Sequence, residues 1–122
     1  MESNSWIKYK IEIRERLREF ALNILLLSEK IPAGISGKVI NYQLTKSGTS
    51  VYANYRAALR GRSKAEFFSK ISIAVEEADE VEMWLELLII SGILSDELTE
   101  KLHAESLEIV KILSSMRKRI ST

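Results

Sequence analysis

The sequence contains no cysteine and only one histidine, His103. Without cysteine the chain has no disulfide framework, no thiolate nucleophile and no cysteine-ligated zinc or iron–sulfur site. A single histidine leaves a Ser-His-Asp relay with one possible base, and it gives a histidine-rich metal site too few ligands. We therefore expect a protein that is not an enzyme and that uses no cofactor and no metal.

Turn residues are also scarce, because the 122 residues include only five glycines and one proline. Average usage of these two residues would be roughly 12% of a chain. An all-β sandwich or barrel needs a turn roughly every 8–12 residues. This class of fold is therefore excluded.

Long hydrophobic runs are absent as well. The longest runs without Asp, Glu, Lys or Arg are nine residues, at 20–28, 47–55 and 87–95, whereas a membrane-spanning helix needs about 20. The first ten residues, MESNSWIKYK, contain no apolar signal core. We expect a cytoplasmic protein without a membrane partner.

Apolar residues recur at alternating intervals of four and three, which is the 3.5-residue repeat of a bundle helix. The first stripe is Ile13, Leu17, Phe20, Ile24, Leu27 and Ile31, and the third is Phe67, Ile71, Ala74, Ala78, Val81, Leu85 and Leu88. The only proline lies in the loop 31–37, Ser63 and Glu66 form a capping box, and Gly92 follows the third stripe. Ser95 or Asp96 can cap the last helix.

These signals predict helices over about 8–31, 37–60, 64–91 and 96–119. Short connections between four helices of this length indicate an all-α fold, an antiparallel up-down-up-down four-helix bundle, as a single domain over 1–122. In the second helix, the small residues at 47–50 predict close approach to a neighbouring helix and hydroxyls bonded to the preceding turn. Asn54 lies on the apolar stripe, and a carboxylate of the third helix is a candidate partner for its amide.

Two stretches are apolar on more than one face, residues 20–27 and residues 87–94. In a protein of this size a second apolar face indicates contact with another subunit. The alternative is a monomer with a crowded core. We expect a homo-oligomer, with these candidate interface residues: Leu25, Leu26, Ile89, Ile90, Ile93 and Leu94.

Charge is segregated along the chain. Residues 56–70 carry five basic residues and one acidic residue, whereas residues 71–100 carry nine carboxylates and no Lys or Arg. Clustered basic side chains contact phosphates, and aromatic rings stack on single-stranded bases. The candidate phosphate contacts are Arg56, Arg60, Arg62 and Lys64, with Tyr52 and Tyr55 as candidate stacking residues. The alternative is that these arginines form ion pairs with the carboxylates that follow.

The carboxylates themselves offer little sign of a metal centre. A di-metal site in a helical bundle needs Glu-x-x-His on two helices, and this motif occurs once, as Glu100 and His103. We expect the acidic residues to form a solvated face.

Five segments give a specific resemblance: SGTS at 47–50, ANYR at 53–56, RSKAEF at 62–67, EEADE at 76–80 and WLELL at 84–88. With them the chain, from about residue 17 to residue 117, resembles the four-helix bundle family encoded in intervening sequences of 23S rRNA genes. Tyr52 stands where this family often has glycine. The resemblance implies an antiparallel bundle that assembles into a ring, commonly a homopentamer, without known enzymatic activity. It supplies no ligand-binding residues.

Two functional hypotheses follow. The first is a non-enzymatic, ring-forming protein that binds RNA or another nucleic acid through the basic residues at 56–64. The second is a structural or adaptor protein whose ring scaffolds another protein, with no nucleic-acid contact.

Overall fold

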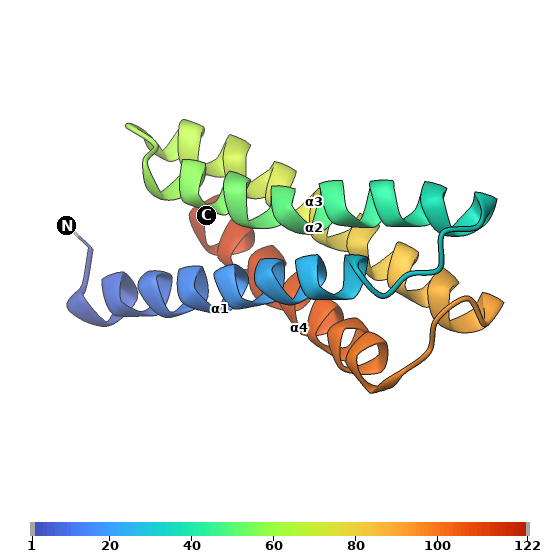
Figure 1. Cartoon of the computed structure of the whole chain (residues 1–122). Helices are drawn as coiled ribbons and strands as arrows, with labels where there is room; N and C mark the ends of the chain where they lie inside the picture. Colours follow the sequence, from blue (N-terminus) through green and yellow to red (C-terminus); the bar gives the residue numbers. More distant parts are fainter. Residues whose placement is uncertain (1, 122) are drawn as a thin grey trace.

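A computed structural model of the chain describes residues 2–121, apart from the side chain of Ser121. It contains α1 (Asn4–Ser28), α2 (Ile35–Leu59), α3 (Lys64–Ser91) and α4 (Glu97–Ser121), and no strand in this range. Successive helices run in opposite directions through short connections, and both chain ends lie near the α2–α3 turn (Figure 1). The predicted all-α four-helix bundle is confirmed.

The predicted apolar stripes form the core. All six residues of the first stripe are buried, and so are all those of the third except the half-buried Phe67. The α2–α3 and α3–α4 seams are the most extensive, and of the four seams between helices the one between α1 and α4 is the smallest. In Figure 1 these two helices diverge toward the α3–α4 turn. No helix in the described range has the length and apolarity needed to cross a membrane.

The first helix starts earlier and ends earlier than its predicted range of 8–31. It begins at Asn4 because the Ser3 hydroxyl accepts a hydrogen bond from the Trp6 backbone N–H at 3.1 Å, and the Trp6 ring is buried. It ends at Ser28, and the chain then continues to Pro32. A proline disfavours helical backbone in the residue before it, here Ile31, which is buried without being helical.

α2 begins at Ile35, two residues before its predicted range, and Gly34 before it supplies no side-chain cap, whereas the caps of α3 and α4 are those that the sequence indicates. Ser63 accepts from the backbone N–H of Glu66 at 3.1 Å, but the Glu66 carboxylate accepts from the Arg62 N–H, one residue before the usual capping-box partner. Gly92 ends α3 in the left-handed region, with φ of 77°. Asp96 is the residue that caps α4, since its carboxylate accepts from the Thr99 N–H at 2.9 Å.

The small residues of α2 let it lie against α1. A Cβ at Gly48 would be 2.9 Å from Cγ2 of Ile24, closer than real contacts allow. The hydroxyls of Ser47 and Thr49 donate to carbonyls four residues earlier, both at 2.9 Å, as predicted. The expected bond of Asn54 to a carboxylate is wrong: its amide donates to the Ser50 carbonyl at 3.0 Å, because that oxygen lies within reach one turn earlier.

Candidate nucleic-acid interface

Four arginines from two neighbouring helices line one groove. Arg14 and Arg18 lie four residues apart on α1, and Arg56 and Arg60 lie four apart on α2, so each pair shares a helix face. The groove has a volume of about 370 Å³, and Tyr52 and Leu59 complete its lining. We call these six residues the arginine groove.

The positive charge of the arginine groove is not neutralised. Among the described residues, none of its four guanidinium groups is in an ion pair. Three of them are exposed, and Arg14 is half-buried. The Arg56 guanidinium carbon lies 5.5 Å from the centre of the half-buried Tyr52 ring, in a cation–π contact. The groove can therefore bind anions and offers an aromatic face beside them.

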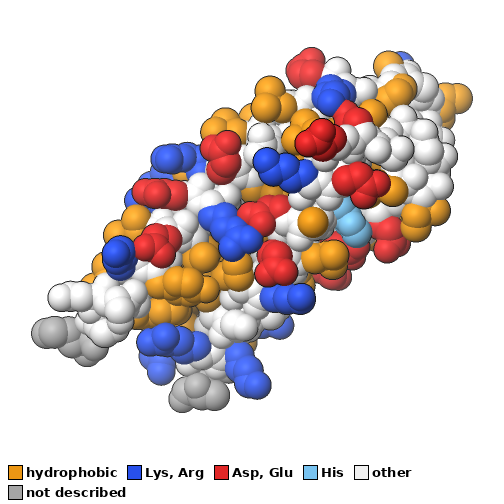
Figure 2. Space-filling view, turned by 90° about the horizontal axis from the view of Figure 1, so that it is seen from below, with side chains coloured by type: hydrophobic (Ala, Val, Ile, Leu, Met, Phe, Trp, Pro, Cys, Tyr) orange, Lys and Arg blue, Asp and Glu red, His pale blue; other side chains and the backbone are white. Residues whose placement is uncertain are grey.

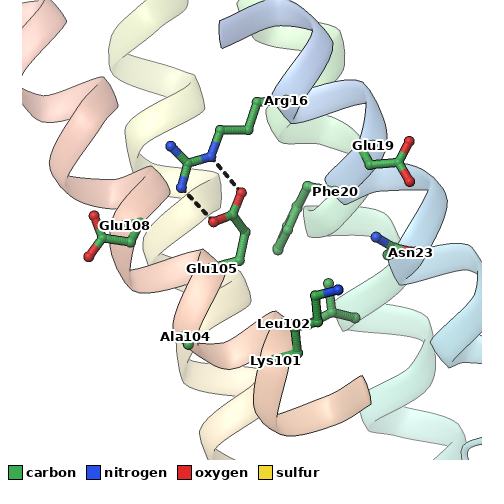
Figure 3. A pocket seen from close by; sticks show the side chains of 9 residues that line it. All are labelled: Arg16, Glu19, Phe20, Asn23, Lys101, Leu102, Ala104, Glu105 and Glu108. Atoms are coloured by element: carbon green, nitrogen blue, oxygen red, sulfur yellow. Dashed lines mark hydrogen bonds and ion pairs between the residues drawn. The ribbon is translucent and has the colours of Figure 1, made fainter. Parts of the chain in front are cut away.

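Arg16 differs from the arginines of the groove, because it forms an ion pair with Glu105. Its Nε and Nη2 each donate to the Glu105 carboxylate at 2.6 Å, across the pocket between α1 and α4 that Phe20 also lines (Figure 3). The bidentate hydrogen bonds to Glu105 raise the pKa of Arg16 above its ordinary value. Arg16 thus joins two helices, whereas Arg14 and Arg18 of the arginine groove, one on either side of it along α1, form no ion pair among the described residues.

The predicted basic residues divide between two places. Arg56 and Arg60 lie in the arginine groove, whereas Arg62 and Lys64 are exposed at the α2–α3 turn. Arg60 also lines a shallow pocket with Arg62 and Lys70, so the basic surface continues from the groove around the end of the bundle. None of these residues forms an ion pair with the carboxylates of α3 in the described part of the chain.

Tyr55 cannot stack on a base, and this part of the sequence interpretation is wrong. Its side chain has no exposed surface, and its hydroxyl donates to the Lys10 carbonyl at 2.8 Å. Burial raises the pKa of Tyr55. The apolar repeat of α2 indicates this burial, because Tyr55 lies four residues after Val51 and three before Ala58, which are both buried.

Sequence reasoning also missed Arg14 and Arg18. They alternate with carboxylates in IEIRERLREF, so the local net charge hides them. The four-residue spacing of Arg14 and Arg18 could have identified them as a pair, because it places both on one helix face. Only the packing of α1 beside α2 brings this face to Arg56 and Arg60.

The candidate residues of the oligomer interface also differ in their exposure. Leu25, Leu26 and Ile90 are exposed, with Leu26 at 60% and Ile90 at 74%. Ile89, Ile93 and Leu94 are half-buried, and the last two pack against the chain's own core. Further apolar residues are exposed at the same end of the bundle, which the α1–α2 and α3–α4 connections form: Leu22, Ile35, Val39, Tyr42 and Leu87.

Comparisons with known proteins agree with the bundle and assign it to a family. No curated protein matches the chain. A crystal structure of a protein of unknown function from the S23 ribosomal protein family of Bacteroides thetaiotaomicron is similar, with 37% identity and a TM-score of 0.81. The match covers 89% of this chain and 97% of that one. The model for the 23S rRNA-intervening sequence protein family matches residues 9–115, and the chain belongs to this family.

Proposed function

We propose that this protein is a non-enzymatic, ring-forming protein that binds RNA or another nucleic acid through the arginine groove. The observation that carries the proposal is the set of four arginines without acidic partners, gathered around Tyr52. Guanidinium groups recognise phosphate with paired N–H donors.

The groove combines the two kinds of contact that single-stranded nucleic acid needs. Its arginines would track successive phosphates, and the accessible part of the Tyr52 ring would stack on a base, a contact worth about 1–3 kcal/mol. The exposed Arg62 and Lys64 would extend the path of the strand around the α2–α3 turn. Four phosphate contacts on a single strand predict a logarithmic salt dependence with a slope near −3, at about −0.7 per phosphate.

Fluorescence anisotropy with labelled single-stranded RNA and a labelled stem-loop, at low salt, tests the proposal. We expect the double variant Arg56→Gln/Arg60→Gln to weaken binding at least tenfold and to reduce the salt slope, because two phosphate contacts are lost. The matched control is Lys38→Gln/Lys101→Gln, which removes the same charge from exposed positions outside the groove.

Two results would contradict this function. One is no salt-dependent binding at tens of micromolar protein. The other is an equal loss of affinity in the groove variant and the control variant, since this would indicate only a response to net charge.

The exposed apolar end favours a second candidate, an adaptor that scaffolds another protein. Ile35 is 89% exposed, and Val39 and Tyr42 lie beyond it along α2. A pull-down from native cells, with and without nuclease treatment, separates the two functions. A partner protein that remains after nuclease treatment, together with no bound nucleic acid in the untreated sample, would support the adaptor.

A further inference from the structure

The only histidine lies beside two glutamates of a different helix. His103 of α4 meets Glu82 and Glu86 of α3, and one ligand atom from each lies within 4.8 Å of the others. The imidazole Nε2 is 2.7 Å from Oε2 of Glu82. In Figure 2 the pale blue histidine lies at the surface among acidic side chains. We call these three residues the His-Glu cluster.

We propose that the His-Glu cluster binds a divalent transition-metal ion, with Zn²⁺ as the best fit. One imidazole nitrogen and two carboxylates are a donor set that zinc accepts, and water completes the tetrahedron. With zinc-to-ligand distances near 2.1 Å, two ligand atoms of a tetrahedral site lie about 3.4 Å apart. In the cluster Nε2 of His103 is 2.7 Å from Oε2 of Glu82, and the three ligand atoms all lie within 4.8 Å of one another, so small side-chain movements would bring them to this spacing.

The helices hold the three ligands on one site. Glu82 and Glu86 are one turn apart and therefore share a face of α3. α3 packs along α4, which carries His103. The side chains of Glu82 and His103 are each 22% exposed, whereas Glu86 is exposed, so an ion would be held against the seam and remain open to water on one side.

The surrounding charge also favours a cation. No Lys or Arg occurs between Ile71 and Glu100, so α3 offers no competing basic side chain of its own near the cluster. Among the described residues, the His103 imidazole and the Glu82 carboxylate are polar partners only of each other. A metal ion would replace this hydrogen bond and would also bind the carboxylate of Glu86.

The cluster lies apart from the arginine groove. The groove is on the α1–α2 seam, and the cluster is on the α3–α4 seam. A result on zinc binding therefore does not depend on whether the protein binds nucleic acid.

Isothermal titration of the full, untagged chain with ZnCl₂ in a non-chelating buffer tests the site. We expect one zinc per chain, and His103→Gln or Glu82→Gln/Glu86→Gln to weaken binding at least tenfold. Both substitutions retain hydrogen-bonding groups and keep the variants close to the native packing. The matched control is Glu100→Gln, an exposed carboxylate three residues before His103 and outside the cluster, with an expected change of less than twofold.

Because His103 is the only histidine, its imidazole nitrogen resonances report the site directly. We expect zinc to shift the Nε2 signal of the wild-type chain. Three results would overturn the proposal: no binding at about 100 µM zinc, binding that leaves the imidazole signals unchanged, or equal losses in Glu100→Gln and His103→Gln.

Discussion

Tyr52 and Tyr55 lie three residues apart on α2 and have different surroundings. Tyr52 contacts the Arg56 guanidinium at the surface, whereas Tyr55 is enclosed by the core. The Tyr55 hydroxyl reaches α1, where it donates to the Lys10 carbonyl at 2.8 Å. Tyr55 therefore contributes both apolar burial and a polar link between two helices.

Tyr55→Phe tests that link. Loss of one buried hydrogen bond is expected to lower the free energy of unfolding by about 0.5–1.5 kcal/mol. Tyr55→Ala also leaves a cavity, and its expected cost is about 3–5 kcal/mol. Urea denaturation followed by circular dichroism measures both. Tyr52→Ala is the comparison, and a cost as large as that of Tyr55→Ala would contradict the division of roles.

Glu77 gives a prediction about pH. Burial raises the pKa of Glu77, and the neighbouring Glu80 charge adds to the shift. A raised pKa means that the fold favours the neutral carboxyl, so ionisation lowers stability as the pH rises through the folded-state value. We expect Glu77→Gln to raise the Tm near pH 7 and to have no such effect below about pH 3, where the carboxyl is protonated in both states. Thermal melts across this range check the sign, with the exposed Glu76→Gln as control.

At the scale of helices, the apolar spacing predicts most of the fold. The stripes of the first and third helices are buried as expected, because a 3.5-residue repeat leaves few other ways to bury them. The bounds of α1 were less predictable. Ser3 caps the helix at the backbone N–H of Trp6, and the Trp6 ring, outside the predicted stripe, packs into the core.

Gly48 offers a test of how closely two helices approach. In an exposed helix, glycine to alanine stabilises by roughly 1 kcal/mol. Here the added Cβ would lie 2.9 Å from Cγ2 of Ile24, so we expect Gly48→Ala to destabilise the wild-type chain instead. In an Ile24→Ala background the Cγ1 and Cγ2 atoms are gone and only the Cβ of residue 24, at 3.3 Å, remains, so the same change is expected to cost less. Urea denaturation of this double-mutant cycle measures the difference. An equal effect in both backgrounds would show that the two residues are not coupled.

At the scale of the whole molecule, antiparallel packing turns charge segregation along the chain into charge segregation in space. The α2–α3 turn, with Arg62 and Lys64, lies at the same end as the two chain ends (Figure 1). On the face in Figure 2 basic and acidic side chains are mixed over most of the surface, and the histidine lies among acidic side chains.

This arrangement explains why only part of each candidate site was predictable from the sequence. Arg56 and Arg60 belong to one local basic run and could be found there. Arg14 and Arg18 join them only through the packing of α1 against α2. Similarly, Glu100 is near His103 in sequence, but the helix pairing brings Glu82 and Glu86 to the imidazole instead.

The exposed apolar end of the bundle is a candidate surface for assembly. Burying a large apolar side chain contributes about 1.5–3 kcal/mol of stabilising free energy. Leu26 and Ile90 are both mostly exposed in the single chain, so burying them between subunits would stabilise an oligomer. We expect the protein to form a homo-oligomer, with a pentamer preferred from the family resemblance, that is only weakly sensitive to salt.

Light scattering after size-exclusion chromatography measures the mass as a multiple of the 13.9 kDa chain. Leu26→Glu/Ile90→Glu is expected to shift it toward the monomer, because two charges would have to be desolvated between subunits. Ile7→Glu is the control, since Ile7 is also exposed but lies at the opposite end of α1. A monomeric wild-type chain at micromolar concentration would refute the oligomer, and a dimer would refute the pentamer alone. If both variants retain the wild-type mass, assembly uses another face of the bundle. A ring repeats the same head-to-tail contact at every interface. Unpaired carboxylates buried in the apolar part of that contact would therefore destabilise every interface of the ring.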